Sequence, residues 1–138
     1  DLARDLGLPV VIHDREADED VLEELDKRPV KAMIHRFFSR SGYGKAFAER
    51  GIGLGIGPAI TYPDAGELIK TVEAIDSSLI LLETDAPFLP SASRAGMRAD
   101  SSDIIDVISA ISRIKGISEE DVAEIAYRNA AALFGIRR

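Results

Sequence analysis

The fold class of this chain is decided by the sequence LILLETDAP, residues 79–87. Its leading apolar run has the length and composition of a buried strand, and the two carboxylates and the proline that follow end that strand. Two other apolar runs end in the same style, at His13 and at His35. Three strands therefore deliver two imidazoles and the Asp85 carboxylate at their carboxyl ends, where parallel α/β folds place their chemistry.

Apolar runs alternate with helical patterns along the whole sequence. We expect strands at 8–13, 30–35, 53–57 and 79–82, and helices at 18–27, 43–50, 64–74, 102–115 and 118–133. Asp18 and Ser118 are the expected caps of the first and the last of these helices. Strands joined by helices through short connections predict an α/β fold of four βα units around a parallel sheet, in a single domain over 1–138.

The two ends of the pattern differ from its middle. The sequence opens on a helical stretch, 1–6, which looks like the last turns of a helix closed by Gly7. Because no initiator Met precedes it, we expect a truncation, a processed end or a missing upstream segment. Towards the other end, a long loop rich in Pro, Ser and Arg spans 86–100 and is expected to lie beside the Asp85 carboxylate.

Composition excludes several classes of site and partner. The 138 residues include no Cys, which rules out disulfides and thiolate metal sites and suits a cytoplasmic location. No apolar run approaches the roughly 20 residues that cross a bilayer, so no membrane is expected. The net charge of −7 gives no indication of a broad basic surface that would bind nucleic acid electrostatically. A nucleic-acid substrate would have to be held locally, by a few Arg side chains and a metal.

Five motifs, taken in order, resemble the TatD family of metal-dependent deoxyribonucleases. They are GLPVVIHDR at 7–15, IHRFFS at 34–39, GPAITY at 57–62, LETDAPFL at 82–89 and NAAALFGI at 129–136. No single motif is specific, but their order and spacing are, and they cover nearly the whole chain. The resemblance implies the C-terminal half of a (β/α)8 TIM barrel of the metal-dependent hydrolase type, strands five to eight.

The resemblance also implies an activity and a metal site. It implies hydrolysis of phosphodiester bonds in DNA, with one or two divalent metal ions (Mg, Mn or Zn) at the C-terminal mouth of the barrel. By matching position, His13, His35 and Asp85 look like metal ligands. Asp85 would also be catalytic, because the last ligand in this family can orient or deprotonate the attacking water.

Three arginines are candidates for binding the substrate phosphate. Arg15 lies two residues beyond His13, so on a strand it would point to the same side. Arg94 and Arg98 lie on the long loop, where a guanidinium can contact phosphate through two hydrogen bonds. For each of them, a salt bridge or a solvated surface charge is the alternative.

The sequence departs from the family pattern in ways that leave the site incomplete. The family opens its barrel with a His-x-His pair and adds a Glu on a later strand, and neither is present, since His13 and His35 are the only histidines. Arg36 stands where the family usually has Cys. The loop motif around Arg94 lacks the usual Asn and Pro. We therefore expect the chain alone to bind metal weakly or not at all, and its activity alone is open.

Other interpretations stay open beside this one. The chain could be a non-catalytic half-barrel that self-associates into a dimer, or a hydrolase of another phosphoester or of an amide. Either histidine could be a hydrogen-bonded strand-end residue. Glu83 is expected to orient neighbouring groups rather than bind metal. Phe88 could stack on a base, but packing under the loop is the expectation. Gly53, Gly55 and Gly57 are expected to allow close packing.

Overall fold

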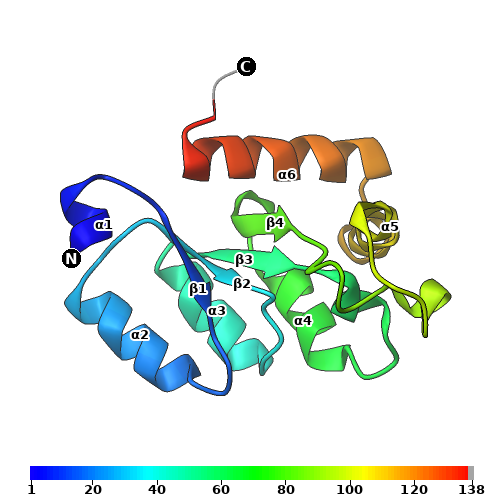
Figure 1. The fold of residues 1–138 in the computed structure, drawn as a ribbon, viewed down its shortest axis with the longest axis horizontal. Helices are drawn as coiled ribbons and strands as arrows, with labels where there is room; N and C mark the ends of the chain where they lie inside the picture. The colour runs from blue at the N-terminus through cyan, green and yellow to red at the C-terminus, as the bar shows by residue number, and fades with distance from the viewer. Residues whose placement is uncertain (137–138) are drawn as a thin grey trace.

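Four parallel strands form one sheet in the order β1-β2-β3-β4 (Figure 1). The computed structural model describes residues 1–136. The strands are β1 Val10–His13, β2 Ala32–His35, β3 Gly53–Ile56 and β4 Ile80–Leu82. Their register pairs His13 with His35, Ile34 with Leu54 and Ile56 with Leu82. The parallel sheet predicted from the alternating pattern is therefore confirmed.

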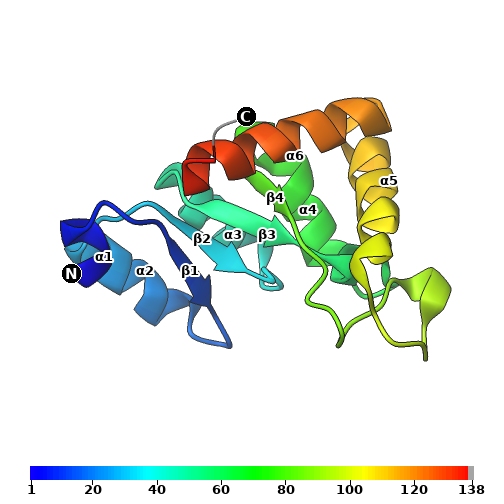
Figure 2. The same cartoon turned by 45° about the horizontal axis from the view of Figure 1, so that its top comes forward.

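Helices follow each strand, and their positions agree with the pattern in the sequence. They are α1 Leu2–Asp5, α2 Asp18–Lys27, α3 Ser41–Glu49, α4 Gly66–Ala74, α5 Ile104–Lys115 and α6 Glu119–Phe134. In Figure 1, α2, α3 and α4 lie below the sheet, and α6 lies above it against β4. Figure 2 shows α5 running from the long loop up to the start of α6. No helix within residues 1–136 is long and apolar enough to cross a membrane.

The core lies between the sheet and the helices below it. Ile34, Leu54 and Ile56 of the strands are almost fully buried, together with Phe47 of α3 and Val72 of α4. Burying one such side chain stabilises the fold by about 1.5–3 kcal/mol. This packing fixes the strands, and with them the positions of the polar residues that follow each strand.

The first turns of α6 and α2 show how the local sequence determines where a helix begins. The Ser118 hydroxyl accepts a hydrogen bond from the backbone N–H of Asp121 at 3.0 Å, so its predicted role as the cap of α6 is confirmed. The predicted cap at Asp18 is wrong, because Asp18 is already the first residue of α2 and Ala17 precedes it. Asp14 satisfies that end instead, since its carboxylate accepts from the Ala17 N–H at 3.0 Å.

Two glycines of β3 make room for side chains of β4 and of the segment after it. A Cβ atom on Gly53 would overlap the Leu81 side chain, and one on Gly55 would overlap the Glu83 carboxylate. Both glycines are buried. The expectation of close packing along this strand is confirmed, and Gly55 contributes directly to the site, because it leaves space for Glu83.

Candidate active site at the carboxyl ends of the strands

The three residues predicted as metal ligands lie together at one edge of the sheet. His13 and His35 end neighbouring strands in register, and their ring centroids are 5.9 Å apart. The Nε2 atom of His35 lies 3.3 Å from Oδ1 of Asp85. Parallel strands bring their carboxyl ends to a common edge, which is why His13 and Asp85, 72 positions apart in the sequence, both lie beside His35.

Glu83 fixes the orientation of the His35 ring. Its Oε2 atom lies 2.8 Å from Nδ1 of His35, and both side chains are largely buried. With Glu83 ionised, Nδ1 carries the proton and donates it, so the lone pair of Nε2 faces Asp85. A carboxylate behind a histidine is the usual arrangement for a metal-binding imidazole. The expectation that Glu83 orients a neighbouring group agrees with this contact.

The carboxyl group of Glu83 is under opposing influences. Burial is the larger one and raises the pKa of Glu83, while the contact with His35 and the backbone N–H of Arg36 act to lower it. Its Oε1 atom is buried and has no hydrogen-bond partner within residues 1–136. One oxygen of Glu83 therefore contacts His35, and the other is buried without a hydrogen-bond partner, which lowers the stability of the fold. This arrangement is typical of a residue whose position matters more than its contribution to stability.

Arg36 forms an ion pair with Asp85 on the side away from His35. Its Nη1 atom lies 3.3 Å from Oδ2 of Asp85, and its side chain is 41% exposed. Both residues have a left-handed backbone, with φ of +51° at Arg36 and +52° at Asp85. Such a backbone is uncommon outside glycine, although Asp tolerates it better than most residues. The two oxygens of Asp85 thus face a histidine and an arginine.

The spacing of His35 and Asp85 fits a divalent ion. Two ligands of a tetrahedral zinc ion bound at 2.0–2.2 Å lie about 3.3–3.6 Å apart, and the facing atoms here are 3.3 Å apart. The nitrogen and oxygen donors suit Zn, Mn or Mg. The set is incomplete, however, because within residues 1–136 no group of three or more His, Asp or Glu side chains is arranged to hold a metal ion. Two donor atoms, Nε2 of His35 and Oδ1 of Asp85, are therefore close enough to bind one ion, and His13 lies next to His35.

An open pocket of about 400 Å³ adjoins these residues. His13, Arg15, Arg36 and Phe38 line it. Arg15 is exposed and forms no hydrogen bond or ion pair with any of residues 1–136. The prediction that Arg15 lies on the same side as His13 agrees with this placement. The pocket thus presents two guanidinium groups beside the predicted ligands, together with the side chains of three acidic residues, Asp14, Glu16 and Asp64.

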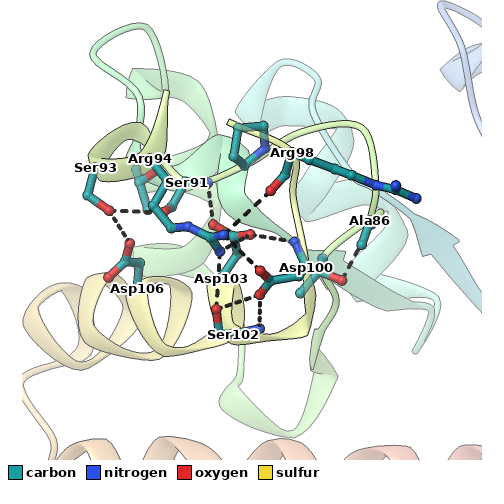
Figure 3. A network of polar contacts seen from close by, with 12 residues as sticks. Ala86, Ser91, Ser93, Arg94, Arg98, Asp100, Ser102, Asp103 and Asp106 are labelled. Atoms are coloured by element: carbon teal, nitrogen blue, oxygen red, sulfur yellow. Dashed lines mark hydrogen bonds and ion pairs between the residues drawn. The ribbon is translucent and has the colours of Figure 1, made fainter. Parts of the chain in front are cut away.

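Arg94 is held in a polar network of the long loop (Figure 3). Its guanidinium donates to Asp100 at 2.7 Å and to Asp103 at 2.9 Å. Asp103 is fully buried and also accepts from the backbone N–H groups of Ser91 and Asp100. The N–H of Ser91 is the main cause that lowers the pKa of Asp103. These contacts commit the Arg94 side chain to the loop.

Two other residues of the loop, Arg98 and Phe88, point outwards. The Arg98 side chain extends away from the network in Figure 3 and is exposed. Phe88 is 78% exposed, so the expectation that it packs under the loop is wrong. The loop is closed by Arg94 and its carboxylates instead, which leaves Phe88 without a role in packing. A phosphate role for Arg98 stays a prediction.

Residues 1–135 match the family described as TatD related DNase. The chain belongs to this family. It is 31% identical to an uncharacterized metal-dependent hydrolase, YabD, of Bacillus subtilis, over 98% of this chain and 54% of the relative. It is 29% identical to an uncharacterized metal-dependent hydrolase, TatD, of Mycobacterium tuberculosis, over 99% of this chain and 52% of the relative.

A solved TatD structure has the same fold. The crystal structure of YjjV, a TatD homologue from Escherichia coli K12, superposes with a TM-score of 0.90 at 24% identity, over 99% of this chain and 53% of that one. A hydrolase TatD family protein from Entamoeba histolytica superposes with a TM-score of 0.80 at 21% identity. The chain thus spans about half the length of the TatD relatives that it matches.

One feature of this TatD chain escaped the sequence argument. Arg36 was noted only as a departure from the family's usual Cys. Its contact with Asp85 depends on the left-handed backbone at both residues, and neither is a glycine or an asparagine that would have signalled it. Phe38, 53% exposed at the rim of the pocket, carried no signal either.

Proposed function

We propose that this chain is the C-terminal half of a (β/α)8 TIM barrel, and that the complete barrel hydrolyses phosphodiester bonds in DNA with a divalent metal ion. The observation that supports it most is the line of Glu83, His35 and Asp85, in which an oriented imidazole nitrogen faces a carboxylate oxygen at 3.3 Å. The chain matches about half the length of TatD relatives that are named metal-dependent hydrolases, which supports both the half-barrel and the use of a metal ion.

His13, His35 and Asp85 would hold the ion. When bound, a divalent ion supplies an acidified water and neutralises charge on the phosphoryl oxygens. Glu83 keeps the proton of His35 on Nδ1, and so keeps Nε2 available. The Asp85 carboxylate accepts a proton from the attacking water, which makes it the catalytic residue of the proposal.

Two positive side chains would receive the substrate. Arg15 lies in the pocket beside His13 and has no partner within residues 1–136, so its charge is available to a phosphate of DNA. Arg98 is exposed on the loop and can contact the phosphate backbone further out. Arg94 is better explained as the residue that shapes this loop, since two carboxylates already bind it.

The open edge of the sheet supports the half-barrel part of the proposal. β1 is an edge strand, and Val11 in it is 52% exposed. Leu6 and Leu8, just before it, are more than half exposed as well. An unpaired edge with apolar neighbours needs a covering partner. In the proposal an N-terminal half-barrel covers this edge and adds the remaining ligands, in a cytoplasmic enzyme.

The same edge favours a second candidate function. A second copy of the chain could cover β1, giving a non-catalytic dimer of two half-barrels in which neither copy has a complete site. Analytical ultracentrifugation separates the two candidates. A dimer that neither binds nor cleaves DNA would favour this alternative, while a monomer would exclude it.

Hydrolysis by a completed barrel tests the proposal. We would fuse the N-terminal half of Bacillus subtilis YabD to residue 1 and incubate the fusion with single-stranded DNA and Mn²⁺. We expect cleavage by the fusion, little or none by the chain alone, and loss of cleavage in the fusion with Asp85→Asn. A folded fusion that binds Mn²⁺ but cleaves small carboxylic esters or amides and not DNA would contradict the assigned substrate.

A further inference from the structure

Phe38 exposes its aromatic ring at the pocket beside the site. The ring is 53% exposed, lines the pocket of about 400 Å³ and is not part of the hydrophobic core of residues 1–136. The residues on either side of it are anchored. Phe37 is 2% exposed within the core, and the Ser39 hydroxyl donates to the Asp18 carboxylate at 2.7 Å. The turn after β2 therefore holds the Phe38 ring at the pocket, where no packing of the described chain uses it.

Aliphatic side chains from two other segments add to the surface of the pocket. Ala59 comes from the 3₁₀ turn Pro58–Thr61, and Leu89 comes from the long loop. The loop is tied down next to this turn, since the Tyr62 hydroxyl donates to the carbonyl oxygen of Pro90 at 3.0 Å. The pocket is thus formed before a ligand binds. An aromatic ring with aliphatic neighbours suits a ligand that has a flat, apolar face.

The charged side chains of the pocket do not suit an anion. Among the described residues they are two guanidinium groups and three carboxylates, those of Arg15, Arg36, Asp14, Glu16 and Asp64. Arg36 is already paired with Asp85. One oxygen of Asp14 accepts from the Ala17 N–H at 3.0 Å, and the other is buried. The carboxylates outnumber the guanidinium groups and would repel a phosphate placed among them.

Three of these five side chains are available to a ligand. Arg15, Glu16 and Asp64 are exposed and form no hydrogen bond or ion pair with any of residues 1–136. A guanidinium group only donates hydrogen bonds, and a carboxylate only accepts them. A nucleobase matches both, because its edge carries acceptors and, in most bases, an amino donor. Its flat face stacks on aromatic side chains.

We propose that this pocket binds one base of a single-stranded DNA substrate, stacked on Phe38, and that it favours bases with an exocyclic amino group. Glu16 and Asp64 accept from that amino group, while the phosphates stay outside the pocket. A single strand is required because the faces and edges of a base in a duplex are already stacked and paired. The choice of DNA rests on the proposed function, whereas the preference for a base over a phosphate rests on the lining of the pocket.

The absence of Trp from the 138 residues allows a direct measurement of stacking. In Phe38→Trp the new indole is the only tryptophan of the chain, and a base stacked on it quenches its fluorescence. The matched control is Phe134→Trp, at a ring of α6 that is 41% exposed and does not line the pocket. Both variants are titrated in EDTA with single strands of about ten nucleotides. One strand contains only deoxycytidine, one only deoxyuridine and one only abasic sites.

We expect the deoxycytidine strand to quench the tryptophan at position 38 and not the one at position 134, and the abasic strand to quench neither. The deoxyuridine strand should bind about tenfold more weakly, since a carbonyl replaces the amino group and one charged hydrogen bond is lost. Glu16→Gln and Asp64→Asn, combined in the Phe38→Trp chain, should reduce this difference to less than about twofold, because an amide can pair with either group.

The chain without tryptophan gives the second measurement. Phe38→Leu should bind a labelled deoxycytidine strand at least about fivefold more weakly than the wild type, the loss of one stacked base, and Phe134→Leu should bind it equally well. Quenching by the abasic strand, equal quenching at the two positions, equal binding of the two pyrimidine strands, full affinity in Phe38→Leu or no binding at all would each overturn the proposal. No metal is present, so a completed barrel that fails to cleave DNA would contradict the proposed function and leave these titrations to decide the pocket.

Discussion

Glu83 holds the ring of His35 from behind, with Oε2 at 2.8 Å from Nδ1, so that the opposite nitrogen faces Asp85. This relationship gives a strand-end histidine the fixed orientation that the proposed metal ligand needs. Neither residue could do so alone, because the imidazole has two nitrogens and the choice between them is set by the partner of the other. The carboxylate is accommodated only because Gly55 has no side chain.

Replacing Glu83 by Gln should weaken the site without unfolding the chain. The amide can present its NH₂ group to Nδ1, which would move the imidazole proton to Nε2 and block that nitrogen as a ligand. In the completed barrel we expect a 10- to 100-fold loss of Mn²⁺ affinity and of cleavage, as is typical for outer-shell partners of metal ligands. Glu73→Gln, on the exposed surface of α4, is the control, and calorimetry is the measurement.

Replacing Gly55 by Ala should disturb both stability and the site. Its Cβ would overlap the Glu83 carboxylate and approach Met33, so one of the two has to shift. We expect a loss of about 1–3 kcal/mol in the free energy of unfolding, the usual result of overpacking. Urea denaturation measures it. Gly42→Ala in α3, where a Cβ would meet nothing, should be neutral or stabilising; equal losses at the two positions would contradict the assigned role of Gly55.

Replacing Arg94 by Ala should loosen the loop that carries Phe88 and Arg98. The change removes charged hydrogen bonds to Asp100 and to the buried Asp103. We expect about 1.5–3 kcal/mol of lost stability and faster proteolysis within the loop. Arg98→Ala should cost less than about 0.5 kcal/mol, because that side chain is exposed. If Arg94→Ala instead leaves stability unchanged and weakens only phosphate binding, Arg94 belongs to the substrate site.

Asp103 should make the stability of the chain depend on pH under acidic conditions. Hydrogen bonds from the Ser91 and Asp100 backbones lower its pKa from the ordinary value of 3.8. Its contribution is therefore fully present above pH 3.8 and is lost as the pH falls through the lower folded value. We expect the unfolding free energy of the wild type to fall in that window, and that of Asp103→Asn to fall less. Identical acid profiles in urea denaturation would contradict this.

Much of the fold and the centre of the site could be predicted from the sequence. The apolar runs that end at His13, at His35 and before Asp85 are enough to predict that these residues lie at one edge of the sheet, since parallel strands must present their carboxyl ends there. Four strands, their parallel direction and the helices follow from the same alternation. The cap at Ser118 follows from local chemistry that needs no tertiary contact.

What the sequence could not provide depends on contacts between distant residues. Asp18 has the chemistry of a cap, but the turn before α2 places Ala17 at that position, and the Ala17 N–H donates to Asp14. Arg94 is indistinguishable from a phosphate ligand until the loop folds back on Asp103. Phe side chains are usually buried, but Phe88 is 78% exposed on the long loop, and nothing local in the sequence distinguishes the two outcomes.

The central claim is that a divalent ion binds between His35 and Asp85, and a crystal of the chain soaked in Mn²⁺ tests it most directly through anomalous scattering. The claim predicts a manganese peak about 2.0–2.2 Å from Nε2 of His35 and from Oδ1 of Asp85, with the Arg36 side chain displaced from the carboxylate. A soaked crystal with no peak at this edge of the sheet, and with Arg36 still paired to Asp85, would contradict it.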